Sequence, residues 1–112
     1  MQISITFKNF NSSEAVKAYV HEKFDRLDKM LDYPADAHIV LSVEKLRNIA
    51  DINLNCDSLK IYAKEEVENN IYAAIDKLSD KVKTQIRKHK DKQRWHLSGD
   101  KQSIKEGDAA WQ

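Results

Sequence analysis

Residues that form most small-molecule sites are scarce in this sequence. Glycine occurs only twice in 112 residues, at Gly99 and Gly107, so the rest of the chain has no glycine-rich loop for nucleotide phosphates. The single cysteine, Cys56, cannot form an internal disulfide bond, which suits a reducing cytosol. Cys56 also falls on the apolar side of an alternating segment, and this position indicates a small core residue.

Long apolar runs and catalytic patterns are missing as well. No segment approaches the roughly 20 apolar residues that a membrane-spanning helix needs, and residues 1–10 alternate instead of forming a signal peptide. The four histidines are scattered, without the spacing to cysteine or acidic residues that a metal site shows. We therefore expect no enzymatic activity, no metal or cofactor, and no association with a membrane.

Charge is almost balanced over the whole chain but not along it. Nineteen Lys and Arg residues oppose eighteen Asp and Glu residues, so the total gives no preference for a polyanion. Residues 81–94, however, carry seven cations and only one acid, Asp91. Cations can complement the dipole at the end of a helix, but that needs one or two charges in the last turn. Seven cations in fourteen residues repel one another, so we favour a polyanionic partner.

Alternation of apolar and polar residues predicts four strands. The last three of these segments are joined by short polar connections, which is typical of antiparallel hairpins. The predicted strands are residues 2–8, 38–45, 48–56 and 59–64.

Apolar residues at intervals of three and four predict two helices. The first covers residues 13–31, and Asn11 or Ser12 is suited to cap its N-terminus. The second covers residues 66–94, with an apolar stripe that begins at Val67. Its first half is acidic outside the stripe and its second half is basic.

The resulting order of elements is β-α-β-β-β-α, which predicts an α+β fold. Each strand and each helix has one apolar face, so we expect a four-stranded sheet with two helices packed on one face. The length suits one domain over residues 1–94. Residues 95–112 show no periodicity, and we expect them to form a flexible polar tail.

Part of the second predicted helix carries a recognisable motif. Residues 70–78 read Asn-Ile-Tyr-Ala-Ala-Ile-Asp-Lys-Leu, and residues 88–92 read Lys-His-Lys-Asp-Lys. Together with Lys81-Val82 and Gln85-Ile86, they closely resemble the short ribosome hibernation-promoting factors. That family includes the ribosome-associated inhibitor called protein Y and was once named sigma-54 modulation protein. The resemblance covers residues 1–92 and implies the same β-α-β-β-β-α fold, which resembles a double-stranded-RNA-binding domain.

The resemblance also implies a function. It indicates a cytoplasmic factor that binds the small ribosomal subunit in the decoding cleft, over the A and P sites. There the factor would exclude mRNA and tRNA and inhibit translation in stationary phase or stress, as a monomer when off the ribosome. The rRNA-binding residues that the resemblance implies are Lys81, Arg87, Lys88, Lys90 and Lys92 on the second helix and Lys23, Arg26 and Lys29 on the first. Tyr72, Asp76 and Gln85 match family positions as well, and the resemblance leaves their role open between packing and orientation.

Departures of this sequence from the family bear on whether it promotes ribosome dimers, and three alternatives to the favoured function stay open. We expect it to lack the second domain by which long members dimerise ribosomes, and to promote dimers together with a separate ribosome modulation factor. Its tail is nearly balanced in charge, unlike the acidic tail of the ribosome-associated inhibitor, whose type keeps ribosomes as inactive monomers. A general binder of structured RNA is the second alternative. A protein-binding regulator of a sigma factor is the third, and belongs to another functional class.

Overall fold

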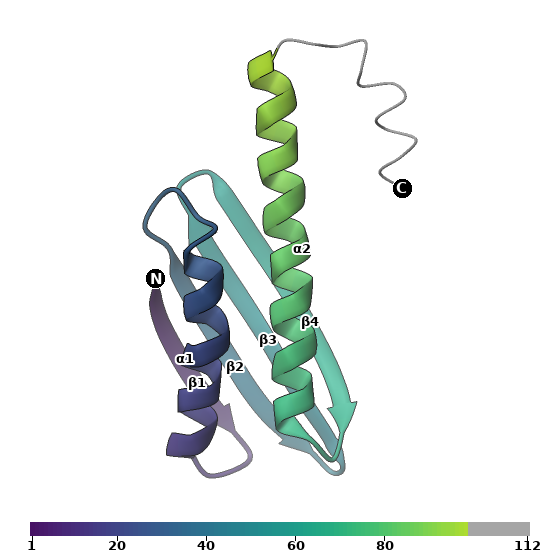
Figure 1. The fold of residues 1–112 in the computed structure, drawn as a ribbon. Coiled ribbons are helices and arrows are strands. Elements are labelled where there is room, and N and C mark those ends of the chain that lie inside the picture. Colours follow the sequence, from purple (N-terminus) through teal and green to yellow (C-terminus); the bar gives the residue numbers. More distant parts are fainter. Residues whose placement is uncertain (99–112) are drawn as a thin grey trace.

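The chain forms one sheet and two helices (Figure 1). The structure, a computed structural model, describes residues 1–98, with side chains described as far as Asp91. Its elements are β1 (Gln2–Lys8), α1 (Glu14–Asp28), β2 (Asp36–Glu44), β3 (Arg47–Cys56), β4 (Leu59–Glu68) and α2 (Ile71–Ser98). The predicted order of elements is confirmed, whereas the likeness to a double-stranded-RNA-binding domain stays a prediction.

The four strands follow the order β1-β2-β3-β4 across the sheet. β1 is parallel to β2, and α1 provides the long connection that a parallel pair requires. β2, β3 and β4 form two antiparallel hairpins, as the short polar connections predicted. Both helices cover the same face of the sheet, so the predicted arrangement is confirmed (Figure 1).

The core lies between this face and the helices. Val20 and Phe24 of α1 and Ile75 and Leu78 of α2 are completely buried against the apolar side of the strands. Cys56 is 4% exposed and belongs to the same cluster, which confirms its prediction as a core residue. Apolar burial of this kind is the main stabilising contribution to a small domain.

The boundary between β4 and α2 differs from the prediction. Residues 66–68 extend β4, where Glu66 pairs with Ile49 of β3, so a helix beginning at residue 66 and a helical stripe including Val67 are wrong. Glu-Val-Glu alternates, and alternation suits a strand as well as it suits one turn of a helix. Asn70 then caps α2, because its Oδ1 accepts hydrogen bonds from the backbone N–H groups of the second and third helical residues.

The other helix ends also shift by a few residues. α1 is capped by Ser13, whose Oγ accepts a hydrogen bond from Val16 N at 3.3 Å, and not by Asn11 or Ser12. It ends at Asp28, three residues before the predicted end. α2 continues to Ser98, so its backbone stays helical past residue 94. The remainder of the predicted tail, residues 99–112, lies outside the described residues.

Turns within residues 1–98 are made without glycine. Four connections instead place a non-glycine residue in the left-handed region, with φ between 57° and 66°. Asparagine and aspartate tolerate this region better than most residues, which explains three of the four positions. These residues are Asn9, Lys45, Asp57 and Asn69.

Candidate nucleic-acid interface

The two helices lie side by side and run in the same direction (Figure 1). Tyr19 of α1 contacts Asp76 of α2, and further along Met30 lines a small cavity together with Ile86 and Lys90. The C-terminal half of each helix carries most of its cations. A parallel arrangement therefore brings the basic parts of both helices to the same end of the molecule.

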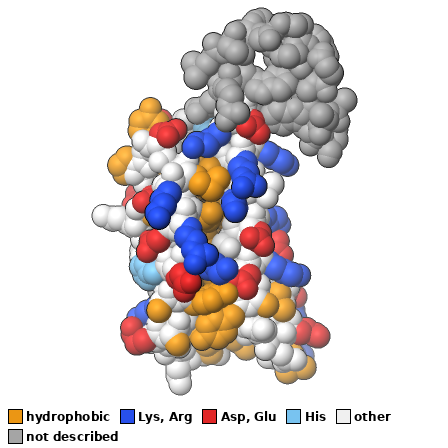
Figure 2. Space-filling view, in the orientation of Figure 1, with side chains coloured by type: hydrophobic (Ala, Val, Ile, Leu, Met, Phe, Trp, Pro, Cys, Tyr) orange, Lys and Arg blue, Asp and Glu red, His pale blue; other side chains and the backbone are white. Residues whose placement is uncertain are grey.

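The cations of α2 lie on two flanks. Lys81 forms an ion pair with Glu65 of β4, so its flank faces β4, and Lys88 lies two turns further on the same side. Lys90 lies on another side of the helix, where it lines a small cavity with residues that follow α1 and with the turn between β3 and β4. Figure 2 shows Lys and Arg side chains on both sides of a strip of apolar side chains on the helix-covered face.

Ion pairs divide the predicted rRNA-binding residues into two groups. Lys23 pairs with Asp76 at 3.2 Å, Arg26 with Glu22 at 3.2 Å, and Lys81 with Glu65 at 3.0 Å. The second group forms no ion pair with any side chain of residues 1–91, and its members are exposed except for the half-buried Lys90. This group is Lys29, Arg87, Lys88 and Lys90. The side chain of Lys92 lies outside the described residues.

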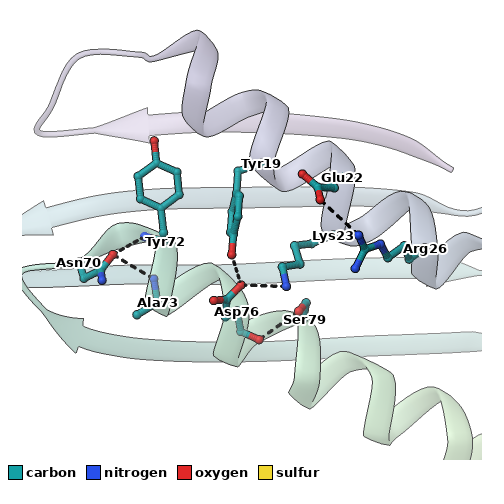
Figure 3. Close-up of polar contacts among 9 residues, drawn as sticks. All are labelled: Tyr19, Glu22, Lys23, Arg26, Asn70, Tyr72, Ala73, Asp76 and Ser79. Atoms are coloured by element: carbon teal, nitrogen blue, oxygen red, sulfur yellow. Dashed lines mark hydrogen bonds and ion pairs between the residues drawn. The ribbon is translucent and has the colours of Figure 1, made fainter.

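A polar and aromatic cluster joins the two helices (Figure 3). The Tyr19 hydroxyl donates a hydrogen bond of 2.5 Å to Asp76 Oδ1, and Lys23 Nζ lies 3.2 Å from the same oxygen. The ring of Tyr72 packs edge-on against Tyr19, with centroids 5.0 Å apart. Lys23 Nζ also lies 5.6 Å from the centre of the Tyr19 ring, within range of a cation–π contact.

Asp76 changes the titration of both of its partners. The hydrogen bond to its carboxylate raises the pKa of Tyr19 above the ordinary value, with burial as the next cause. The same carboxylate raises the pKa of Lys23, first through the hydrogen bond and then through its charge. At neutral pH, Lys23 is therefore charged and Tyr19 is protonated, so both donate to Asp76.

Sequence reasoning identified Tyr72 and Asp76 but missed Tyr19. Tyr19 has the spacing of the apolar residues of α1, so the pattern indicates only a packing residue. Its hydroxyl is the one feature that could have indicated a polar contact, because a buried tyrosine needs a polar partner. Gln85 is half-buried on α2, and its role stays a prediction.

Neither a metal site nor a membrane-spanning segment is found in the described part of the chain. Within residues 1–98 there is no group of three or more His, Cys, Asp or Glu side chains that could hold a metal ion. None of the helices in the same range is long and apolar enough to cross a membrane.

Comparisons with known proteins place this arrangement among ribosome-associated factors. The family described as "Sigma 54 modulation protein / S30EA ribosomal protein" matches residues 3–94. The "Ribosome hibernation promoting factor" of Klebsiella oxytoca is 42% identical over 96 residues, which are 86% of this chain and 100% of that protein. The protein of the same name from Escherichia coli (strain K12) is 38% identical over the same shares of both chains.

Two solved structures have the same fold. The N-terminal domain of Thermus thermophilus Protein Y matches with a TM-score of 0.73 and 30% identity, over 80% of this chain and 99% of that domain. A ribosomal subunit interface protein from Coxiella burnetii matches with a TM-score of 0.71 and 27% identity, over 80% of this chain and 98% of that chain.

Proposed function

Because this chain belongs to the sigma 54 modulation protein / S30EA ribosomal protein family, we propose that it is a ribosome hibernation factor in the cytoplasm. It binds the small ribosomal subunit in the decoding cleft, over the A and P sites. Its presence there excludes mRNA and tRNA and inhibits translation in stationary phase or stress. One observation carries the proposal: two parallel helices bring to one end of the molecule cations that form no ion pair with the side chains of residues 1–91.

These cations bind phosphates of the rRNA backbone. Contacts to phosphates fix the position and orientation of a protein on nucleic acid without reading bases, which suits a face of lysines and arginines. Structured RNA is recognised largely by its shape and its backbone. We assign the direct contacts to Lys29, Arg87, Lys88, Lys90 and Lys92.

The ion-paired cations contribute less to binding. Lys23, Arg26 and Lys81 each already contact a carboxylate, so a phosphate must compete with that acid or share the cation with it. We therefore place these three residues at the border of the rRNA-binding surface.

Ribosome dimers are a further consequence of binding. We propose that the chain, a monomer off the ribosome, promotes dimers together with a ribosome modulation factor. The alternative is that it keeps ribosomes as inactive monomers. Sucrose-gradient profiles of stationary-phase ribosomes, with and without the protein, separate the two outcomes.

The salt dependence of binding tests the proposed function directly. With roughly five to seven phosphates engaged, raising the salt from about 50 to 200 mM weakens binding to purified small subunits by about two to four orders of magnitude. Binding is measured by co-sedimentation at each salt concentration. An almost constant affinity over this range would contradict phosphate binding.

Two controls distinguish this function from its rivals. A factor in the decoding cleft is excluded by tRNA and mRNA that are already bound to the subunit, in the absence of free RNA, whereas a general RNA binder still binds such a subunit elsewhere. Capture of a protein partner that survives both RNase and high salt would instead indicate a protein-binding regulator, such as a modulator of a sigma factor.

A further inference from the structure

Asp76 is an acid within the face that carries the rRNA-binding cations. Its side chain is 44% exposed, and a carboxylate there repels an approaching phosphate. On charge alone, an uncharged residue at this position would serve RNA binding better. The contacts of Asp76 offer a reason for the acid, because they connect it to two residues of α1 that are one helical turn apart.

Asp76 supplies the directional contact between the helices. Among the described residues, its interactions with Tyr19 and Lys23 are the side-chain hydrogen bond and the ion pair that join α1 to α2. α1 is otherwise held by buried apolar residues, whose attraction has no preferred direction. Apolar packing resists a shift of α1 along α2 less sharply than a directional contact does, and the two donors to one oxygen oppose such a shift.

Neighbouring residues shape the place where Tyr19 and Asp76 meet (Figure 3). Ser79 is a small residue, only 7% exposed, and its hydroxyl donates to the backbone oxygen of Asp76 at 3.0 Å. Tyr72 packs against the Tyr19 ring at an interplanar angle of 87° and restricts the direction of the Tyr19 hydroxyl.

We propose that Asp76 is a positioning residue for RNA binding, which fixes α1 against α2 so that cations of both helices reach one polyanion together. The inference rests on the proposed function, since it concerns the same basic surface. Lys23 then acts mainly through Asp76, by holding α1 and by neutralising the acid, and not as a direct phosphate contact.

For the variant Asp76→Asn, the inference predicts a change in RNA affinity opposite to the change that charge alone predicts. Asp76→Asn removes a negative charge near the RNA, and simple electrostatics predicts tighter binding. The amide oxygen of Asn is a weaker acceptor than a carboxylate, so the helices are held less firmly. This predicts weaker binding, by about three- to tenfold, because an ordered arrangement of contacts lowers the entropic cost of association.

Asp80→Asn is the matched control for this experiment. Asp80 lies one turn further along α2, is exposed, and uses only its backbone oxygen to accept a hydrogen bond from Thr84. The two substitutions change the net charge equally. With purified small subunits at fixed salt, we expect Asp76→Asn to bind more weakly than wild type and Asp80→Asn to bind equally well or more tightly. Equal affinities of the two variants would overturn the inference.

The effect of Lys29→Ala on affinity, compared between wild type and Asp76→Asn, distinguishes a positioning role of Asp76 from a simple loss of stability. In the wild type, Lys29→Ala removes a phosphate contact supplied by α1 and weakens binding. In Asp76→Asn, where α1 is held less firmly, the same substitution has a smaller effect. Equal effects in both backgrounds, measured where circular dichroism shows both proteins folded, would mean that Asp76 does not position α1.

Tyr19→Phe is a milder variant of the same contact. Binding by the wild type separately distinguishes the proposed function from the role of Asp76. Tyr19→Phe keeps the ring and removes one donor to Asp76, so we expect a smaller loss of affinity in the same direction. A gain in affinity would contradict the positioning role. Failure of the wild-type chain to bind small subunits would overturn the proposed function, whereas normal wild-type binding with unaffected variants would overturn only the role of Asp76.

Discussion

The two halves of α2 differ in what surrounds them. Up to Ile86, the helix buries a completely covered apolar stripe and places Asp76 and Lys81 in ion pairs with α1 and β4. After Ile86 none of the described side chains is completely buried, and Arg87 and Lys88 form no ion pair with any described side chain. The last part of the helix extends beyond the sheet (Figure 1). The first half therefore stabilises the fold, and the second half has charges available for a partner.

This difference implies that stability and binding depend on different residues of one helix. Apolar burial stabilises the domain at any moderate salt concentration, whereas phosphate binding by cations weakens as salt is added. Substitutions in the two halves should consequently have opposite profiles in unfolding and binding experiments.

The largest expected effect is on binding. Changing Arg87, Lys88 and Lys90 together to Glu should weaken binding to the small subunit about a thousandfold or more, because three phosphate contacts become repulsive. The free energy of unfolding should change by less than about 1 kcal/mol, because Arg87 and Lys88 are exposed and Lys90 is only half-buried. Co-sedimentation and urea unfolding measure the two quantities.

A triple variant on other elements controls for net charge. Lys8, Lys45 and Lys60 are exposed on β1, on the β2–β3 connection and on β4. Their change to Glu alters the total charge by the same amount, so only the general attraction to RNA is reduced. We expect this variant to lose far less affinity, and equal losses in the two triple variants would rule out a localised site.

Removing core volume from the first half of α2 should have the next largest effect. Leu78 is completely buried, so Leu78→Ala should lower the free energy of unfolding by about 3 kcal/mol through lost burial and the cavity left behind. At a temperature where the variant stays folded, its affinity for the small subunit should stay within about twofold of wild type. Leu46→Ala, at a 60% exposed position, is the matched control and should hardly change stability.

The smallest expected effect concerns pH and the Asp76 cluster. The pKa values of Tyr19 and Lys23 are raised above their ordinary values of 10.0 and 10.5, and both groups are protonated when they donate to Asp76. A raised pKa stabilises the fold below the unfolded value, and this contribution is lost as the pH rises through the folded pKa. The stability difference between wild type and Asp76→Asn should therefore be constant from about pH 7 to 9 and shrink above about pH 10.

Urea unfolding of both proteins over this pH range measures that difference. Exposed ion pairs contribute little to stability, which is why this effect is the smallest of the three. Asp80→Asn controls for the general titration of lysines, since it should show no comparable decrease. A difference between wild type and Asp76→Asn that persisted at high pH would show that neither Tyr19 nor Lys23 stabilises the fold through the acid.

Most of the fold could be predicted because the patterns that define it are local. β1 has the predicted bounds, since its alternation is strict and is followed by polar turn residues. The β4–α2 boundary could not be placed, because Glu66 to Glu68 suits both a strand and a helical turn. That error had a consequence for the site: Glu65 lies on the extended β4, where it meets Lys81.

The clustering of cations at the site could be predicted from the sequence, but the side-chain contacts between the two helices could not. The cations of α2 are close in sequence, so their clustering needed no knowledge of the fold. Tyr19 and Asp76 are 57 residues apart, and their contact depends on how far α1 is displaced along α2. That displacement results from side-chain packing between the helices, which no local pattern records.

Cys56 provides a natural probe of the motions of this domain. It is the only thiol in the chain, it is 4% exposed, and its Sγ donates to the Tyr33 carbonyl at 3.2 Å. Because this sulfur is buried, a thiol reagent reacts with it faster when the structure around the end of the β3–β4 hairpin opens, so the rate of labelling reports such opening. Labelling with and without bound small subunits would show, without any introduced dye, whether binding also makes the sheet more rigid.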